Sequence, residues 1–414
     1  MLPLSYFEKR NPAVLSDQIY NDSAKSSEKS VFDQIANIQV LKEFNVDQGA
    51  FEKIKDYLSN ANFKEKTFIH KKQSQLSFSL AYNPIEEKVF LKTRGLAPIG
   101  FGSSCNLVAG LDLNTHSKVV YRSLPTHKVP EAERDINIRL SERPDLFVAT
   151  KEIYDYEGSF EYDNEGIFSC KRQKEFSTER KIPTHPLHKK LGPKTCFILE
   201  RLDSDLMDLL NFEILNFQDK IDIACDIAKA LDVLHNEYGV VHRDLKLENI
   251  LISLCSVNKN YQAKIADFGQ SEYYDKVPKT GGGTFEYISP EWFLYEIENE
   301  KNGTPDFLPI ADYSSDMWSF GVILFTLFGG VKAFDSWENM LVSNGMIPDH
   351  FSSFKKDFLA TIEENGNERL DKILELIDFC LEVNPLIRIT AWQAHKILQN
   401  LQNPQNPSSA CEIL

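Results

Sequence analysis

The chain has 414 residues, a formal net charge of -15, and a composition that is 42% hydrophobic and 26% charged. These fractions are typical of a globular protein and exclude a collagen-like or wholly disordered chain. The length allows two compact lobes and a shorter accessory region, because single hydrophobic cores stop growing near about 300 residues. The negative charge argues against a nucleic-acid partner, since phosphates attract a positive surface.

The seven cysteines include no Cys-x-x-Cys pair, which argues against a disulfide framework and a zinc site and favours a reducing cytosol. Charge begins at Glu8, too early for the apolar core of a secretory signal. The most apolar internal run, residues 320–330, is shorter than the roughly 20 residues of a membrane-spanning helix. We therefore expect a cytoplasmic protein.

The N-terminal region, residues 1–74, is polar but carries a weak helical pattern within 31–58. The apolar residues recur there at three-residue spacing: Phe32, Ile35, Ile38, Leu41 and Phe44. We predict a helical accessory extension over residues 1–85. A structural brace on the neighbouring lobe is favoured over a separate binding module.

Short β-favouring runs follow at 76–80, 89–91, 99–102 and 119–121, and they predict the antiparallel strands of a small sheet. Residues 156–193 form a charged and irregular stretch that is long for a strand connection. A solvated loop is favoured there over a docking site.

After Glu200 the apolar spacing becomes helical, in residues 221–234, 318–328 and 373–381. The predicted fold class is therefore α+β, with a small antiparallel β lobe preceding a larger α-helical lobe. The tail 399–414 begins with a run rich in Asn, Gln, Pro and Ser, which predicts disorder.

The strongest chemical signal is segment 241–249, which reads Val-His-Arg-Asp-Leu-Lys-Leu-Glu-Asn. Asp-Phe-Gly follows at 267–269. Phosphoryl transfer needs a carboxylate near the attacking hydroxyl and oxygen ligands that hold Mg²⁺ between phosphates. The two segments together offer both kinds of group.

On these residues the chain resembles the protein kinase superfamily, over approximately residues 86–398. The resemblance implies a bilobal kinase fold with an N-lobe at 86–200 and a C-lobe at 201–398, and it implies ATP and Mg²⁺ as cofactors. It assigns the substrate hydroxyl proton to Asp244 and the γ-phosphate to Lys246. It assigns the metal ions to Asn249 and Asp267.

Segment 100–107, Gly-Phe-Gly-Ser-Ser-Cys-Asn-Leu, is similar to the family's glycine-rich phosphate loop, with Cys105 in place of the third glycine. The resemblance implies a nucleotide site whose further members lie on later strands. The residues it places around the nucleotide are Gly100, Gly102, Leu107, Val120, Leu199, Glu200, Leu202 and, for the ribose, Asp205.

Arg122 is a departure from the family pattern. Segment 119–122, Val-Val-Tyr-Arg, falls where the family has Val-Ala-Ile-Lys, so Arg122 stands in the place of the lysine that contacts the α- and β-phosphates. Arginine keeps the charge but replaces a compact donor by a broad planar fork. The expected partner is Glu133, with Glu131 second. Using Lys118 instead would break the alternation of the strand.

Segment 284–291 resembles the end of the family's activation loop, and residues 316–321 resemble the helix beneath the catalytic loop. Arg388 is expected to form a buried ion pair with Glu291. Lys246 and Thr284 resemble serine/threonine kinases rather than tyrosine kinases.

Arg243 is the type of residue that pairs with a phosphate on the activation loop in this family. The candidate acceptors of that phosphate are Ser271, Tyr273, Tyr274 and Thr280. An unmodified, constitutively ordered loop is an equal alternative.

The last four residues, Cys-Glu-Ile-Leu from Cys411, match a prenylation box that takes a geranylgeranyl group. The alternative is an ordinary exposed thiol. A single lipid would give reversible membrane association.

The favoured function is a serine/threonine protein kinase, because Asp244, Asn249 and Asp267 are all present. The alternative is a nucleotide-binding pseudokinase scaffold, motivated by Arg122. A lipid or small-molecule kinase is the third reading. The protein substrate and the oligomeric state do not follow from the sequence.

Overall fold

The structure is a computed structural model, and the chain in it forms two compact units. The first unit comprises Met1–Pro130 and Thr150–Arg201, and the second comprises Glu131–Ala149 and Leu202–Leu414. The described residues are 65–69, 77–83, 88–94, 100–101, 106–112, 115, 117–156, 193–255, 260–276, 283–293, 313–329 and 368–402. The predicted helical pattern at 31–58, the connection at 157–192, Gly102, Cys105, Thr280 and Cys411 lie outside them.

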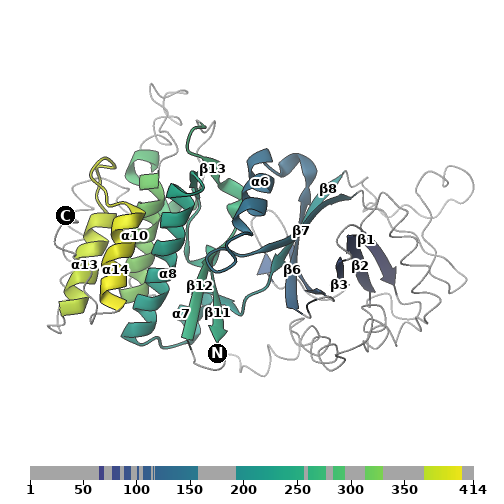
Figure 1. The fold of residues 1–414 in the computed structure, drawn as a ribbon, viewed down its shortest axis with the longest axis horizontal. Helices are drawn as coiled ribbons and strands as arrows, with labels where there is room; N and C mark the ends of the chain where they lie inside the picture. Colours follow the sequence, from purple (N-terminus) through teal and green to yellow (C-terminus); the bar gives the residue numbers. More distant parts are fainter. Residues whose placement is uncertain are drawn as a thin grey trace, which may run out of the picture. The chain divides into compact units, whose positions relative to one another are not determined.

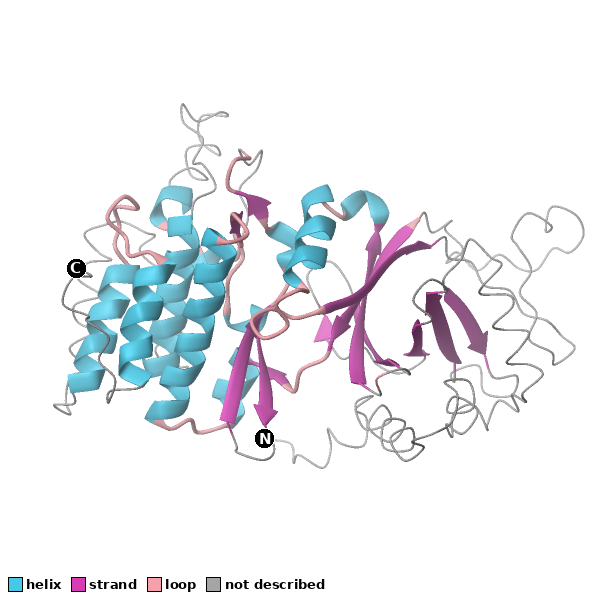
Figure 2. Ribbon diagram, in the orientation of Figure 1, coloured by secondary structure: helices cyan, strands magenta, loops and turns pink. Residues whose placement is uncertain are grey.

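The first unit contains an eight-stranded antiparallel sheet (Figures 1 and 2). The strands are β1 (Glu65–Ile69), β2 (Ser77–Asn83), β3 (Lys88–Arg94), β4 (Gly100–Phe101), β5 (Asn106–Asp112), β6 (Ser117–Pro125), β7 (Thr150–Tyr156) and β8 (Lys194–Glu200). Their order is β1-β2-β3-β5-β6-β8-β7, and β4 pairs with β5. A 3-10 turn, η1 (Thr126–Lys128), follows β6.

The pattern of β6 explains its place in the interior of this sheet, between β5 and β8. Val119 and Tyr121 point to one face and are fully buried, as expected for alternate residues of a strand. Phe90 on β3 and Ile198 on β8 belong to the same apolar cluster. The strands predicted from the short β-favouring runs are confirmed.

β1 was not predicted, because the helical pattern expected in the N-terminal region covers residues 31–58 and no strand was expected before residue 76. It pairs with β2, from Glu65 opposite Ala81 to Ile69 opposite Ser77. β1 and β2 therefore form an antiparallel pair at one edge of the sheet.

The second unit is mainly helical. Its helices are α6 (Glu131–Leu140), α7 (Leu206–Phe212), α8 (Phe217–Asn236), α10 (Tyr313–Gly329), α13 (Glu368–Cys380) and α14 (Ala391–Gln402). Its strands are β9 (Ser204–Asp205), β10 (Val240–Val241), β11 (Ile250–Cys255), β12 (Asn260–Ile265) and β13 (Glu272–Tyr273), and its 3-10 turns are η3 (Leu247–Asn249), η4 (Phe268–Gln270) and η5 (Phe285–Tyr287). Figure 1 shows α8, α10, α13 and α14 packed as neighbours.

The ends and faces of these helices follow from their sequences. α8 begins with a capping box in which the side chains of Asn216 and Asp219 exchange hydrogen bonds with each other's backbone N–H. α10 is apolar on nearly every side, and a helix of that kind is stable only when it is buried. The three helices predicted at 221–234, 318–328 and 373–381 are confirmed. Across the described residues, no helix has the length and apolar character needed to cross a membrane.

The expected disorder from residue 399 onward is wrong for the first four residues, because α14 continues to Gln402. Leu401 is buried, and its carbonyl accepts a hydrogen bond of 2.7 Å from Arg369 Nη2. Gln402 Nε2 donates to Asp222 Oδ1 at 2.9 Å. Contacts with α13 and α8 therefore hold a turn whose composition alone predicts no order.

Asp226 on α8 is expected to make the stability of this unit depend on pH. It accepts a hydrogen bond of 3.0 Å from Ala263 N on β12, and burial raises the pKa of its carboxyl from 3.8 to about 6. A raised folded-state pKa stabilises the fold below pH 4, and that contribution is lost as the pH rises through 6. We expect Asp226→Asn to raise the free energy of unfolding by about 3 kcal/mol at pH 8, and the gain to vanish below pH 4.

Urea unfolding of both proteins at pH 4, 6 and 8 measures this effect. Asp371→Asn, at an exposed position of α13, is the matched control and is expected to show no pH-dependent difference. If Asp226→Asn is less stable than the wild type at pH 8, the hydrogen bond to Ala263 outweighs the cost of burying the charge.

Candidate active site

The catalytic-loop segment at 242–244 is held from beneath by one buried carboxylate, Asp316 of α10. Its oxygens accept hydrogen bonds from His242 N at 2.7 Å and Arg243 N at 2.9 Å. His235 Nε2 on α8 lies 2.9 Å from Asp316 Oδ2. Burial opposes ionisation of Asp316, but the hydrogen bonds and the two histidines outweigh it and lower its pKa. A carboxylate held in this way fixes the loop to two core helices.

Arg243 has a left-handed backbone with a φ of 67°, which is costly for a residue with a side chain. The Asp316 contact compensates for this conformation. Gly283, with a φ of 105°, passes so close that an added Cβ would lie 2.8 Å from the Arg243 carbonyl oxygen. Only glycine fits at this position. The close approach of Gly283 to Arg243 brings the segment that carries Thr284 against the catalytic loop.

Asp244, Lys246 and Thr284 are joined by hydrogen bonds. Thr284 Oγ1 donates to Asp244 Oδ1 at 2.8 Å and accepts from Lys246 Nζ at 2.9 Å. Lys246 Nζ also lies 3.7 Å from Asp244 Oδ2. Asn249 Nδ2 donates to the Asp244 carbonyl oxygen at 2.7 Å and lies 3.4 Å from Oδ2. The structure thus brings together three of the residues predicted from the catalytic loop, together with Thr284.

The Asp-Phe-Gly segment presents a polar residue and buries the next one. Phe268 is 2% exposed and packs edge-on against Phe147, with the ring centroids 6.0 Å apart. His242 lies beside it at 5.3 Å, and His242 Nε2 is 2.9 Å from the Ala266 carbonyl oxygen. Asp267 has a left-handed φ of 61° and an exposed side chain. The buried phenylalanine therefore anchors an aspartate that faces outward.

Asn249 and Asp267 suit a magnesium ion that also binds phosphate. The nitrogen of the Asn249 side chain is engaged with Asp244, which leaves its oxygen as the ligand atom. Across the described residues, no three His, Cys, Asp or Glu side chains cluster as a metal site would require. Mg²⁺ commonly takes only one or two protein ligands beside substrate phosphates and water, so the pair fits that mode.

The predicted nucleotide residues of the sheet unit lie on adjacent strands. Gly100 of β4 pairs with Leu107 of β5, and Val120 of β6 pairs with Leu199 of β8. Glu200 ends β8. The side chains of these residues other than Gly100 are half-buried: Leu107, Val120, Leu199 and Glu200.

The other two predicted nucleotide residues, Leu202 and Asp205, belong to the helical unit. Asp205 has a structural role there that the sequence did not indicate: its Oδ1 accepts a hydrogen bond of 2.8 Å from Asp208 N and caps α7. Burial raises the pKa of this carboxyl. Its predicted contact with a ribose stays a prediction.

Arg122 lies on β6 opposite Phe197 of β8, and its guanidinium carbon is 5.5 Å from the centre of that ring. The half-buried arginine thus stacks a cation on a buried aromatic face. Glu133 is 1% exposed on α6, whereas Glu131 is exposed at the start of the same helix. Arg122 and Glu133 belong to different units, and their ion pair stays a prediction.

The guanidinium of Arg243 has neighbours within its own unit. Nη1 donates to the Gln270 carbonyl oxygen at 3.4 Å, and the guanidinium carbon lies 5.7 Å from the centre of the Trp292 ring. Burial lowers the pKa of Arg243, against the charges of Glu272 and Asp316. Arg243 also lines a small pocket with Asp244 and Thr284.

The predicted phosphate acceptors differ in accessibility. Ser271 is buried, and its hydroxyl donates to the His242 carbonyl oxygen at 3.2 Å. The hydroxyl of Tyr273 is engaged by side chains of α6. Tyr274 is 46% exposed and stacks on Tyr313 at 4.7 Å. Among the three described candidates, Tyr274 is the accessible one.

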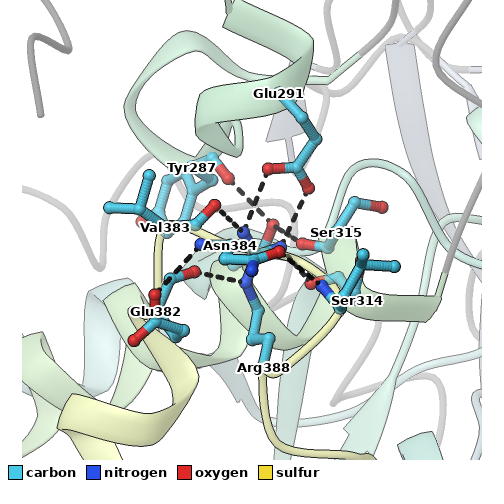
Figure 3. Close-up of polar contacts among 10 residues, drawn as sticks. Tyr287, Glu291, Ser314, Ser315, Glu382, Val383, Asn384 and Arg388 are labelled. Carbon is cyan, nitrogen blue, oxygen red and sulfur yellow. Dashed lines mark hydrogen bonds and ion pairs between the residues drawn. The ribbon is translucent and has the colours of Figure 1, made fainter.

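The predicted ion pair of Arg388 with Glu291 is confirmed. Nη1 and Nη2 donate to the two carboxylate oxygens at 2.9 and 3.0 Å. The same guanidinium donates to the carbonyl oxygens of Ser314 at 2.7 Å and Glu382 at 2.8 Å. Figure 3 shows these acceptors arranged around the arginine, whose side chain is fully buried. The pair joins the segment after Thr284 to α10 and to the loop that precedes α14.

Sequence reasoning placed segment 316–321 beneath the catalytic loop but missed the individual roles of Asp316 and His235. One signal could have identified Asp316, because it is the sole charged residue of the otherwise apolar helix α10. A charge at such a position is costly unless it is paired.

The protein kinase domain family model matches residues 145–400, and the chain belongs to this family. The chain is 28% identical over 199 residues to the LRR receptor-like serine/threonine-protein kinase ERL2 of Arabidopsis thaliana, covering 45% of this chain and 18% of that protein. It is 28% identical over 206 residues to the phosphorylase b kinase gamma catalytic chain, liver/testis isoform, of Bos taurus, covering 49% and 46%.

The chain spans less than half the length of each of these two curated relatives, and the same holds for six other curated relatives that it matches. The described part of the chain accordingly combines an antiparallel sheet with a helical region, as a kinase fold does.

Proposed function

We propose that the chain is a serine/threonine protein kinase that transfers the γ-phosphate of ATP to a protein hydroxyl. The observation that carries this proposal is the hydrogen-bonded set of Asp244, Lys246 and Thr284. A hydroxyl already lies 2.8 Å from Asp244 Oδ1, which shows that the carboxylate accepts from an alcohol at this place. A substrate serine or threonine would present the same chemical group.

In the proposed reaction, a bond forms between the substrate oxygen and the γ-phosphorus while the bond from that phosphorus to the β-γ bridging oxygen breaks. ADP leaves with that oxygen. Asp244 accepts the substrate hydroxyl proton, and Lys246 stabilises the negative charge of the transferring phosphoryl group. Mg²⁺ would neutralise the phosphate charge, and Asn249 and Asp267 would hold it. The proposed nucleotide contacts in the sheet unit are Gly100, Leu107, Val120, Leu199 and Glu200. The kinase domain is proposed to span residues 86–398.

A nucleotide-binding pseudokinase is the second candidate function, and Arg122 is the observation that favours it. The stack on Phe197 holds a guanidinium where the family has a flexible ammonium. A guanidinium still carries a full positive charge, however, and Asp244, Asn249 and Asp267 keep the chemistry that pseudokinases often lose. We therefore favour catalysis.

Substitution of Arg122 tests the choice. Because lysine keeps the full positive charge, we expect Arg122→Lys to retain phosphate transfer within about tenfold of the wild type. Arg122→Ala removes the charge and should lower transfer from labelled Mg-ATP by at least about tenfold. Lys118→Ala, on the same strand, is the matched control and should leave transfer unchanged.

Two outcomes would contradict this assignment. Loss of transfer in Lys118→Ala alone would move the phosphate contact to that lysine. Absence of transfer in the wild type and in Arg122→Lys, with nucleotide-dependent thermal stabilisation still present, would favour the pseudokinase.

A further inference from the structure

The hydroxyl of Tyr273 is held between two side chains of α6. It donates to the carboxylate of Asp135 and accepts a hydrogen bond of 3.1 Å from Arg139 Nη1. Asp135 and Arg139 lie one turn apart, on the same face of α6. Both hydrogen-bonding capacities of a phenol are thus used on one helix.

The aromatic ring of Tyr273 is also engaged, by two cations. The guanidinium carbon of Arg139 lies 5.7 Å from the ring centre, and Lys276 Nζ lies 5.3 Å from it. Arg139 is in turn 5.5 Å from the ring of Tyr238. Burial and the Asp135 carboxylate, opposed by Arg139, raise the pKa of Tyr273. The phenol therefore stays neutral and able to donate throughout the physiological range.

Tyr273 belongs to β13, which is itself fixed to the loop before Asp244. Tyr273 pairs with Val240 and Glu272 pairs with Val241. On the other side, α6 carries the buried Glu133 and packs on both η4 and β13. Tyr273 is consequently a side chain through which the segment following Asp267 is hydrogen-bonded to the helix that carries Glu133.

We propose that Tyr273 is a positioning residue whose hydroxyl fastens α6 to β13 and thereby sets α6 for phosphate transfer. The link needs no modification, because Asp135 and Arg139 satisfy the neutral phenol. The catalytic consequence rests on the proposed kinase function, whereas the mechanical link does not.

The test is Tyr273→Phe in the full chain, which keeps the ring and its cation contacts and removes only the hydroxyl. Loss of a hydrogen bond to a charged group changes an equilibrium constant by roughly tenfold or more. We expect amide hydrogen exchange in 131–140 to quicken by about tenfold without nucleotide, while exchange in α8 and α14 stays unchanged. We expect kcat to fall by a similar factor, with KM for the peptide substrate within about twofold.

Two further variants separate positioning from general stability. Asp135→Asn keeps an acceptor for the phenol and should retain most of the wild-type α6 protection and kcat. Asp135→Leu removes the acceptor and should match Tyr273→Phe in both. Tyr261→Phe removes the hydroxyl of a tyrosine on β12, away from α6, and should change neither readout.

Wild-type exchange of α6 in Tyr273→Phe would overturn the proposal, and so would faster exchange spread evenly over α6, α8 and α14. Faster exchange confined to α6 with wild-type kcat would overturn its catalytic part. If the wild-type chain transfers no phosphate, the proposed function fails, and the exchange experiment still decides whether Tyr273 holds α6.

Discussion

Asp244→Asn is expected to lower phosphate transfer by roughly 10²- to 10⁴-fold, the range over which a general base contributes to catalysis. The substitution is nearly isosteric. An amide oxygen can still accept from Thr284, and the backbone carbonyl still accepts from Asn249, so the local geometry should survive. The loss would therefore report the missing basicity of the carboxylate. Transfer from labelled Mg-ATP to a generic basic protein measures it.

The matched control for Asp244→Asn is Asp232→Asn on α8, which removes a carboxylate from a half-buried pair with His395. It should leave transfer unchanged, and both variants should unfold at the wild-type temperature within a few degrees. If purified Asp244→Asn transfers phosphate as fast as the wild type, and a repeat with independently purified protein excludes a contaminating kinase, Asp244 is not the base. A parallel loss in Asp232→Asn would instead indicate damage to the helical unit.

The sequence predicted the elements whose periodicity is strong and local. The apolar spacing in 221–234 predicted α8 because that helix buries one continuous face on its neighbours. β1 escaped prediction because Glu-Lys-Thr-Phe-Ile has no clear alternation, and its conformation comes from pairing with β2. The last turn of α14 was not predicted for a similar reason. Its polar composition does not favour order, and hydrogen bonds with Arg369 and Asp222 hold it in place.

The residues of the candidate site also fall into those that the sequence predicted and those that it did not. The catalytic loop was predicted because its residues are close in sequence, and the resemblance to kinases gave each a role. Asp316 acts on His242 from 74 residues away, and Tyr273 reaches Asp135 across 138 residues. No local pattern encodes such distances. Only the folded backbone shows which side chains meet.

Arg388→Met is expected to lower the free energy of unfolding by about 3–5 kcal/mol, the typical cost of removing one partner of a buried ion pair. The variant would leave the carboxylate of Glu291 without its bidentate partner. It would also remove the donor to the carbonyl oxygens of Ser314 and Glu382, and the cation that lies 5.2 Å from the Trp318 ring. Thermal unfolding should show a midpoint lowered by roughly 10 °C.

The control for Arg388→Met is Lys372→Met, because Lys372 forms an exposed ion pair with Glu368 on α13 at 3.5 Å. Exposed pairs contribute at most about 1 kcal/mol, so its midpoint should stay within a few degrees of the wild type. Adding Glu291→Met to Arg388→Met should recover part of the loss, since the cost comes mainly from the stranded carboxylate. Equal midpoints for Arg388→Met and Lys372→Met would mean that water or another group compensates Glu291. In that case the pair would not be what holds the segment after Thr284 to α10.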